Sequence, residues 1–400
     1  MGMMRRFYFD RAIDRRGTNA LALEGYAEYL FGDSPPAATP KELLPMWVAD
    51  MQFAAPPPVV EAITTRLAHP IFGYTGHFDD VLFDAFNSWC GTRYGWSVNR
   101  EHLQLSLGVI PALYTLVDLV CRPGDRVVTL SPAYGYFRKA TNRNDIQLIT
   151  SPLVMDDWYP RIDFDDLAAK VRDPRARLFF LCHPHNPTGR AWSADELMRI
   201  ADLCAENGVL IVSDEVHCDL LRRGGVHVPL AKLRPHDTNI VTCMAPSKTF
   251  NLAGLMTAMI IIPDGSLRSA WREAHYPFVN PLGLAAAIGA FDGGASWLEQ
   301  LRDYLDDNFA ALQDLLKTKL PLARFRIPEA TYLAWIDVSA YFPTEVNLTS
   351  YFLETCGVVL EGGEMFIDNG SGAIRLNLAC PQNQLIAAAG KIIEAIHLSA

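Results

Sequence analysis

The sequence contains no apolar run long enough to cross a bilayer and no excess of positive charge. Its 400 residues carry a net charge of −10. This balance disfavours nucleic acid or an anionic membrane as a partner. The first ten residues lack the long apolar core of a secretory signal. We therefore expect a cytoplasmic protein that acts on small molecules.

Paired cysteines, repeats and low-complexity segments are also missing. The eight cysteines occur singly, without a CxxC motif or the spacing of metal ligands. Such a distribution is typical of reduced thiols in a core, and it predicts neither a disulfide framework nor a metal site. Residues 34–40, which are rich in proline and alanine, predict a surface loop.

Short apolar runs in the middle of the chain predict buried strands. They span residues 126–130, 177–182, 209–213, 240–244 and 257–262. Continuous rather than alternating hydrophobicity favours parallel strands that are covered on both faces. The capping box Ser193–Glu196 begins a helix between two of these runs, and Asn207-Gly208 ends it. The predicted fold class is α/β, with a doubly wound, mostly parallel sheet that binds ligands at the carboxyl ends of its strands.

The pattern changes near residue 295. Apolar residues at helical spacing predict a long helix over 297–316, and a C-terminal helix spans 385–396. Short strands are expected at 331–338 and 373–378. We therefore predict a large domain of residues 49–290 and a smaller α+β domain of residues 1–48 plus 291–400.

Polar residues follow several of the predicted strands. Lys248 stands in MAPSKTFNLAGLM, which holds no other charge, and Asp214 follows the run at 209–213. Asn186 and Tyr134 lie in turns after two further strands. Each has an ordinary structural explanation: Lys248 could extend to solvent, Asp214 could cap a helix, and Asn186 could belong to a turn. A buried carboxylate, however, costs several kcal/mol unless it is paired.

These residues together meet the needs of pyridoxal 5′-phosphate (PLP). That cofactor requires an amine for a Schiff base and an acid that keeps its ring nitrogen protonated. It also requires a donor at its phenolic oxygen and an anion site for its phosphate. Gly108, Val109 and Ile110 could open a helix whose free N–H groups hold that phosphate.

Several motifs occur in family-like order through nearly the whole chain. They are PMWVADMQFAAPP, FGYTG, SPAYGYF, HPHNPTGR, SDEVHCDL, APSKTFNLAGL and IRLNLACP. The sequence resembles the fold-type I PLP enzymes of the aspartate aminotransferase superfamily. Within them it is most similar to the MalY/PatB-type cystathionine β-lyases, which are carbon–sulfur lyases.

The resemblance implies catalytic and cofactor-binding roles. Lys248 would be the Schiff-base lysine, Asp214 the partner of the ring nitrogen, and Tyr134 the residue stacked on the ring. Asn186 would donate to the phenolic oxygen. His217 stands where aminotransferases carry a tyrosine for the same oxygen, and a histidine there is typical of the lyases.

The resemblance also implies how the phosphate and the substrate are held. Gly108, Val109 and Ile110 would approach the phosphate, with the Ser247 hydroxyl beside it. Tyr74 would reach the cofactor of a neighbouring subunit, which implies a homodimer with shared sites. Arg375 would bind the substrate α-carboxylate as a bidentate fork.

Three positions depart from the family pattern. Met256 replaces an arginine that aminotransferases use for the phosphate, and Ala245 replaces a common phosphate-binding serine. Both make the expected phosphate site less cationic or less polar. Gln52 replaces the second aspartate of the N-terminal motif. If that carboxylate shapes the substrate pocket, the substrate of this chain would differ from the common one. We expect that pocket to be lined by the N-terminal motif and the loops near Tyr134 and Tyr332.

The resemblance implies a PLP-dependent β-lyase that cleaves cystathionine or related cysteine S-conjugates to a thiol, pyruvate and ammonia. His217, Met256 and the N-terminal motif favour this activity. The alternative is a PLP-dependent class I/II aminotransferase, because both reactions use the same residues. A catalytically silent regulator of the same fold is a third hypothesis, which the presence of Lys248, Asp214 and Arg375 disfavours.

Overall fold

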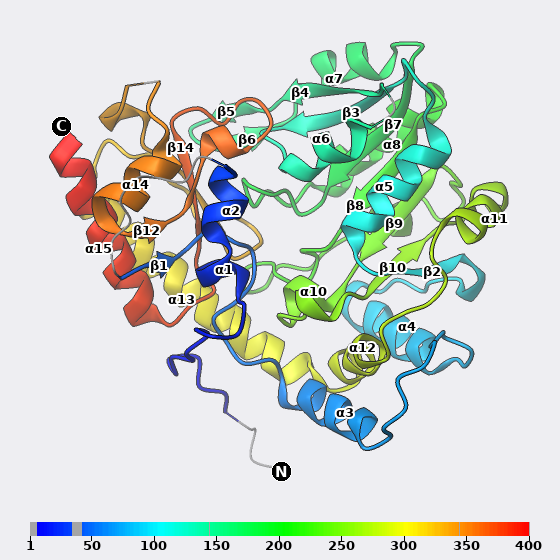
Figure 1. The fold of residues 1–400 in the computed structure, drawn as a ribbon. Coiled ribbons are helices and arrows are strands. Elements are labelled where there is room, and N and C mark those ends of the chain that lie inside the picture. Colours follow the sequence, from blue (N-terminus) through cyan, green and yellow to red (C-terminus); the bar gives the residue numbers. More distant parts are fainter. Residues whose placement is uncertain (1–5, 34–41, 144, 344, 400) are drawn as a thin grey trace.

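A computed structural model describes residues 6–33, 42–143, 145–343 and 345–399. Helices cover a seven-stranded sheet in one part of the molecule, and a three-stranded antiparallel sheet lies in the other (Figure 1). The surface loop predicted at residues 34–40 lies outside the described residues. The α/β fold class is confirmed.

The seven-stranded sheet contains all five predicted runs. Its order is β2 (Leu103–Ser106), β10 (Ala258–Ile261), β9 (Ile240–Met244), β8 (Leu210–Asp214), β7 (Ala176–Cys182), β3 (Arg126–Ser131) and β4 (Gln147–Pro152). The strands from β9 to β4 pair in parallel. The carboxyl ends of these strands therefore meet at one edge.

Strand β10 corrects one expectation. The run at 257–262 was expected to be parallel to the others, but β10 is antiparallel to both β9 and β2. The connection from β9 holds only α10 (Pro246–Thr249) and the 3-10 turn at Ala253–Leu255. A parallel return needs a longer crossover, usually a full helix, so the chain turns back beside β9 instead.

Both faces of the sheet are buried, as continuous hydrophobicity predicts. Leu178, Phe180 and Val212 pack on one face, whereas Phe179 and Ile211 pack on the other. The first face is covered by α5 (Val109–Val120), α6 (Gly135–Thr141) and α11 (Gly265–Ala274), and the second by α7 (Phe164–Val171), α8 (Ala194–Glu206) and α9 (Leu230–Leu233). Helix α8 begins with the predicted capping box and ends at Asn207.

The second part of the molecule has its own core. Its sheet has the order β11 (Leu333–Asp337), β14 (Ala373–Asn377) and β13 (Glu361–Gly362), against α13 (Ala295–Lys319), α14 (Leu348–Cys356) and α15 (Gln382–Ser399). The N-terminal region joins this part, because β1 (Leu44–Pro45) pairs in parallel with β12 (Val358–Val359). Short helices α1 (Leu21–Glu24) and α2 (Tyr26–Phe31) precede it, and the hairpin β5 (Val154–Asp156) and β6 (Tyr159–Arg161) lies after β4.

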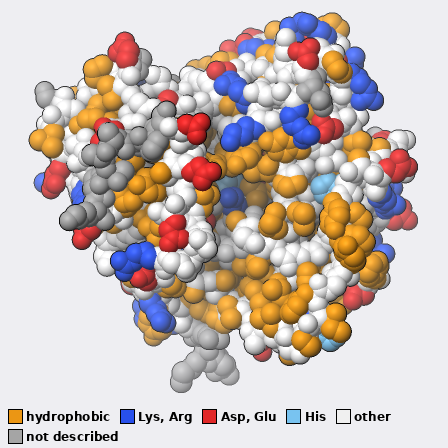
Figure 2. Space-filling model, viewed as in Figure 1, with side chains coloured by type: hydrophobic (Ala, Val, Ile, Leu, Met, Phe, Trp, Pro, Cys, Tyr) orange, Lys and Arg blue, Asp and Glu red, His pale blue; other side chains and the backbone are white. Residues whose placement is uncertain are grey.

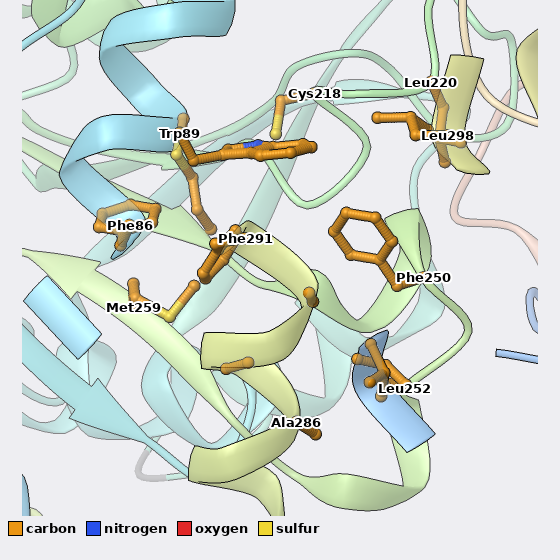
Figure 3. Close-up of a cluster of buried hydrophobic side chains, with 14 of the residues drawn as sticks. Phe86, Trp89, Cys218, Leu220, Phe250, Leu252, Met259, Ala286, Phe291 and Leu298 are labelled. Carbon is orange, nitrogen blue, oxygen red and sulfur yellow. The ribbon is translucent and has the colours of Figure 1, made fainter. Parts of the chain in front are cut away.

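An aromatic cluster supports the segment that carries Lys248. Phe250 follows α10 and packs edge-on against Trp89, with ring centroids 5.5 Å apart, and the centroid of the Phe291 ring lies 5.8 Å from that of the same Trp89 ring (Figure 3). Trp89 belongs to α4 (Val81–Tyr94) and Phe291 to α12 (Pro281–Gly293), which also packs on α3 (Pro57–Leu67). The buried rings fix the backbone two residues after Lys248.

The cysteines form no disulfide among the described residues. All eight cysteines are free thiols, and only Cys356 is partly exposed.

Within the described part of the chain, no helix combines the length and apolar character needed to span a membrane.

Candidate active site

A cavity of about 270 Å³ lies at the carboxyl ends of the parallel strands. Residues of the N-terminal region, of the large sheet and of the small sheet line it together. Figure 2 shows the hollow between the two parts of the molecule. All of the predicted site residues except Tyr74 line this cavity: Gly108, Val109, Ile110, Tyr134, Asn186, Asp214, His217, Ser247, Lys248 and Arg375.

Lys248 lies on α10, directly after β9. Its ammonium donates a hydrogen bond of 2.8 Å to the carbonyl oxygen of Ala49. Burial, with a smaller effect from the Arg375 charge, lowers the pKa of this amine to about 8, although Asp50 and Asp214 oppose the change. The explanation of Lys248 as a lysine that extends to solvent is therefore wrong.

The N-terminal motif forms the wall that faces Lys248. The Tyr332 hydroxyl donates to the same Ala49 oxygen at 2.8 Å. The side-chain amides of Asn251 and Asn377 each donate to two further carbonyl groups of residues 48–53. These bonds hold an irregular segment in place, because each backbone group finds a fixed partner.

Asp214 ends β8 at the floor of the cavity and is 7% exposed. Its carboxylate accepts one hydrogen bond within the described residues, from the Val216 N–H at 3.3 Å. Burial raises the pKa of Asp214 to about 6, against the lowering effects of that bond and of Lys248. A turn rather than a helix follows β8, so the helix-capping explanation is wrong. The carboxylate retains acceptor capacity towards the cavity.

Asn186 and His217 line the same cavity as this carboxylate. The Asn186 amide oxygen accepts a 2.9 Å hydrogen bond from Arg375, which leaves its NH2 group as a donor for the cavity. His217 is buried, and its Nδ1 has no hydrogen-bond partner within the described residues. Burial lowers the pKa of His217 well below its usual value, so its imidazole is neutral.

Arg375 lies on β14 and is 2% exposed. Its Nη1 donates to Asn186, and its Nη2 donates to the carbonyl oxygen of Trp47 at 2.9 Å. The same Nη2 forms an ion pair with Glu361. Burial lowers the pKa of Arg375 to about 10, so it remains a cation near neutral pH.

Another group of lining residues offers hydrogen-bond donors but no cationic side chain. Helix α5 begins here at Val109, and the first N–H groups of a helix have no acceptor within it. Ser247 lies on the same rim. Met256 also lines the cavity, as expected from its position, whereas Ala245 does not. Among the described residues that line the cavity, Lys248 and Arg375 are the only lysine or arginine side chains.

Two predicted positions lie elsewhere. Tyr74 is 84% exposed and packs against Phe278, with centroids 4.9 Å apart. Gln52 does not line the cavity; its N–H donates to the Ala379 carbonyl at 2.8 Å. Gln52 therefore takes no part in the lining of this cavity. Tyr332 does not line the cavity either, but its hydroxyl donates a hydrogen bond to the lining residue Ala49.

The sequence analysis did not single out several lining residues, among them Tyr29, Trp47 and Glu361. Trp47 stood within the quoted N-terminal motif, which was a usable signal. Tyr29 comes from the short helix α2, and the Trp47 ring packs 5.1 Å from it. Glu361 comes from a two-residue strand, where no pattern in the sequence singles it out.

Comparison with known proteins identifies the family. Residues 43–392 match the model for aminotransferase class I and II. The chain belongs to this family. Among curated members, it is 40% identical over 377 residues to cystathionine beta-lyase PatB of Bacillus subtilis, covering 93% of this chain and 95% of that protein. It is 32% identical to protein MalY of Escherichia coli, with 98% and 99% of the two chains covered.

Solved structures of this family agree with the fold. A crystal structure of the PLP-bound C–S lyase from Staphylococcus hominis superposes with a TM-score of 0.96 at 42% identity, over 99% of each chain. Cystalysin from Treponema denticola, whose structure contains pyridoxal 5′-phosphate, gives 0.91 at 27% identity over 98% and 99%. The resemblance to PLP enzymes of fold-type I is confirmed.

Proposed function

We propose that this protein is a PLP-dependent carbon–sulfur β-lyase that cleaves cystathionine or a related cysteine S-conjugate to a thiol, pyruvate and ammonia. One observation carries the proposal. The Lys248 amine, the Asp214 carboxylate and the Arg375 guanidinium face one buried cavity, in a chain that is 40% identical to a named cystathionine β-lyase.

The residues of the cavity fit PLP. Asp214 is buried and has one long hydrogen bond, so it can accept a bond from a protonated ring nitrogen. The free NH2 group of Asn186 and the unpartnered Nδ1 of the neutral His217 can serve the phenolic oxygen. Tyr134 offers an aromatic face at the same wall. The start of α5 and Ser247 supply donors for a phosphate.

Bound PLP would supply an electron sink that stabilises negative charge at the substrate α-carbon. Arg375 would bind the substrate carboxylate and orient the α-carbon towards Lys248. The Lys248 amine would then remove the α-proton, and the burial that lowers its pKa in the cofactor-free protein favours the neutral form that can act as a base. Asp214 would hold a proton on the ring nitrogen. Departure of the β-thiolate, which takes up a proton to become the thiol, completes the elimination, and water then hydrolyses the released 2-aminoacrylate to pyruvate and ammonia.

The proposal includes a homodimer in which Tyr74 completes the partner's site. Ile71, Phe72, Tyr74 and Phe78 are all more than half exposed within one short segment. Such a cluster of exposed apolar side chains indicates an interaction surface. The domain division at residues 48 and 290 and the cytoplasmic location belong to the same proposal.

Transamination is the alternative, because the matching family model describes aminotransferases and the same residues serve both reactions. Product analysis separates the two. Elimination yields pyruvate from an S-substituted cysteine without a second substrate, whereas transamination requires an oxo-acid acceptor.

A further inference from the structure

The cavity holds a carboxylate of its own at the place proposed for the substrate carboxylate. Glu361 on β13 stands directly opposite Arg375 on β14 in the register of the small sheet. Its side chain is 11% exposed, lines the cavity and forms an ion pair with Arg375 Nη2. No other residue within the described chain donates a hydrogen bond to it. Glu361 is therefore held by Arg375 alone.

The donors of Arg375 are almost fully used. A guanidinium carries two hydrogens on Nη1, two on Nη2 and one on Nε. Trp47 and Glu361 take both hydrogens of Nη2, and Asn186 takes one from Nη1. Within the part of the chain that the structure describes, the buried Nε has no hydrogen-bond partner. What remains is one hydrogen on Nη1 and one on Nε.

These two hydrogens cannot form a fork for a second carboxylate. A carboxylate binds a guanidinium in bidentate fashion either across Nη1 and Nη2 or across Nε and Nη2, because the side-chain carbon blocks the third edge. Both forks need a hydrogen of Nη2. The Trp47 carbonyl is part of the backbone and is fixed, whereas Glu361 is a side chain whose rotation can release Nη2.

We propose that Glu361 is a specificity-determining residue that competes with the substrate carboxylate for Arg375. This inference rests on the proposed role of Arg375. A substrate must displace Glu361 before it can engage the fork. A simple carboxylic acid gains only its interaction with Arg375, so it competes poorly with Glu361. An amino acid also engages the cofactor through its amine, and it can overcome the competition.

The test uses the holoenzyme and two probes that lack the reacting amine, 3-(methylthio)propanoate and its neutral amide. Their affinities are measured by calorimetric titration for wild type, Glu361→Gln and Glu361→Ala. Removing the competing negative charge should tighten binding of the acid by about tenfold and leave the amide unchanged. The KM for an S-substituted cysteine should fall in parallel, with a smaller change in kcat.

A matched control is Glu354→Gln, which neutralises an exposed glutamate on α14 outside the cavity. It should bind the acid as wild type does. Thermal unfolding verifies that each variant is folded, and Glu361→Ala provides a second removal of the same charge.

The proposed competition would be wrong if folded Glu361 variants bound the acid no more tightly than wild type, or bound it too weakly to measure. A glutamate that merely positions Arg375 would give that result. The Arg375→Ala variant tests separately whether Arg375 binds the substrate carboxylate, on which this inference rests. If Arg375→Ala binds the acid as tightly as wild type does, the role of Arg375 itself is wrong.

Discussion

The Lys248 amine lies 2.8 Å from the carbonyl oxygen of Ala49, although 199 positions separate the two residues in the chain. This bond joins the end of the large sheet to the N-terminal motif. Tyr332, which directly precedes β11 of the small sheet, donates to the same oxygen. Three distant parts of the chain thus converge on one carbonyl group, and the reactive amine is held in place between them.

The lowered pKa of Lys248 makes the stability of the cofactor-free protein depend on pH. The pKa of its amine is lowered to about 8 from 10.5. Below pH 8 the amine is charged in both states, and its burial costs stability. Above pH 10.5 it is neutral in both, and the cost is gone. Between these values the unfolded chain binds more protons, so stability rises with pH.

Lys248→Met removes this dependence. The free energy of unfolding of wild type relative to this variant should rise by about 3 kcal/mol between pH 8 and 10.5. Denaturant titrations of both cofactor-free proteins across this range measure it. If this difference in the free energy of unfolding stayed constant with pH, the pKa of the Lys248 amine would not be lowered in the folded protein.

Replacing Asp214 should impair catalysis more than cofactor binding. Asp214→Ala removes the carboxylate that would keep the ring nitrogen protonated, an interaction that matters most in the transition state. Both kcat and kcat/KM should fall by about a hundredfold or more. Asp292→Ala, at an exposed position of α12, is the control. Near wild-type turnover by Asp214→Ala would refute the assignment.

Arg375→Lys should weaken substrate binding even though the charge is kept. A lysine ammonium cannot reproduce the fork or its bonds to Asn186 and Trp47. The loss of one charged hydrogen bond is about 1.5–3 kcal/mol, which corresponds to a rise in KM of about tenfold to a hundredfold. Steady-state kinetics measure this rise, and an unchanged KM would place the carboxylate elsewhere.

Tyr74 should act in the site of the partner subunit. Tyr74→Ala and Lys248→Ala are each expected to be inactive, but a dimer that contains one copy of each has one intact site. Random mixing of equal amounts should therefore restore about a quarter of wild-type activity. The mixed dimer can be isolated with two affinity tags. Mixed dimers without activity would exclude a shared site.

The large sheet was predictable where burial leaves a clear pattern. Continuous apolar runs revealed β3, β7, β8, β9 and β10, but the sequence analysis did not identify β2 or β4. Strand β2 includes the polar Gln104, and β4 is an edge strand that is partly exposed. The direction of β10 was also missed, because hydrophobicity reports that both faces are covered and not which way a strand runs.

The site was predictable where chemistry follows a strand end. Lys248, Asp214 and Asn186 stood out as polar residues after buried runs, and the fold brings them to one edge. Glu361 could not be found in this way. Its contact with Arg375 depends on the register of two short antiparallel strands, and one glutamate among many carries no local signal. Tyr29 was missed because it reaches the cavity from a separate helix.

Pyruvate release tests the central claim most directly. Purified wild type and Lys248→Ala, each supplied with PLP, are incubated with cystathionine and a panel of S-substituted cysteines without any oxo-acid. Wild type should release pyruvate, ammonia and thiol in equal amounts from at least one conjugate, and Lys248→Ala should release none. If wild type released no pyruvate from the whole panel but exchanged amino groups between an amino acid and an oxo-acid, the protein would be an aminotransferase and the lyase account would be wrong.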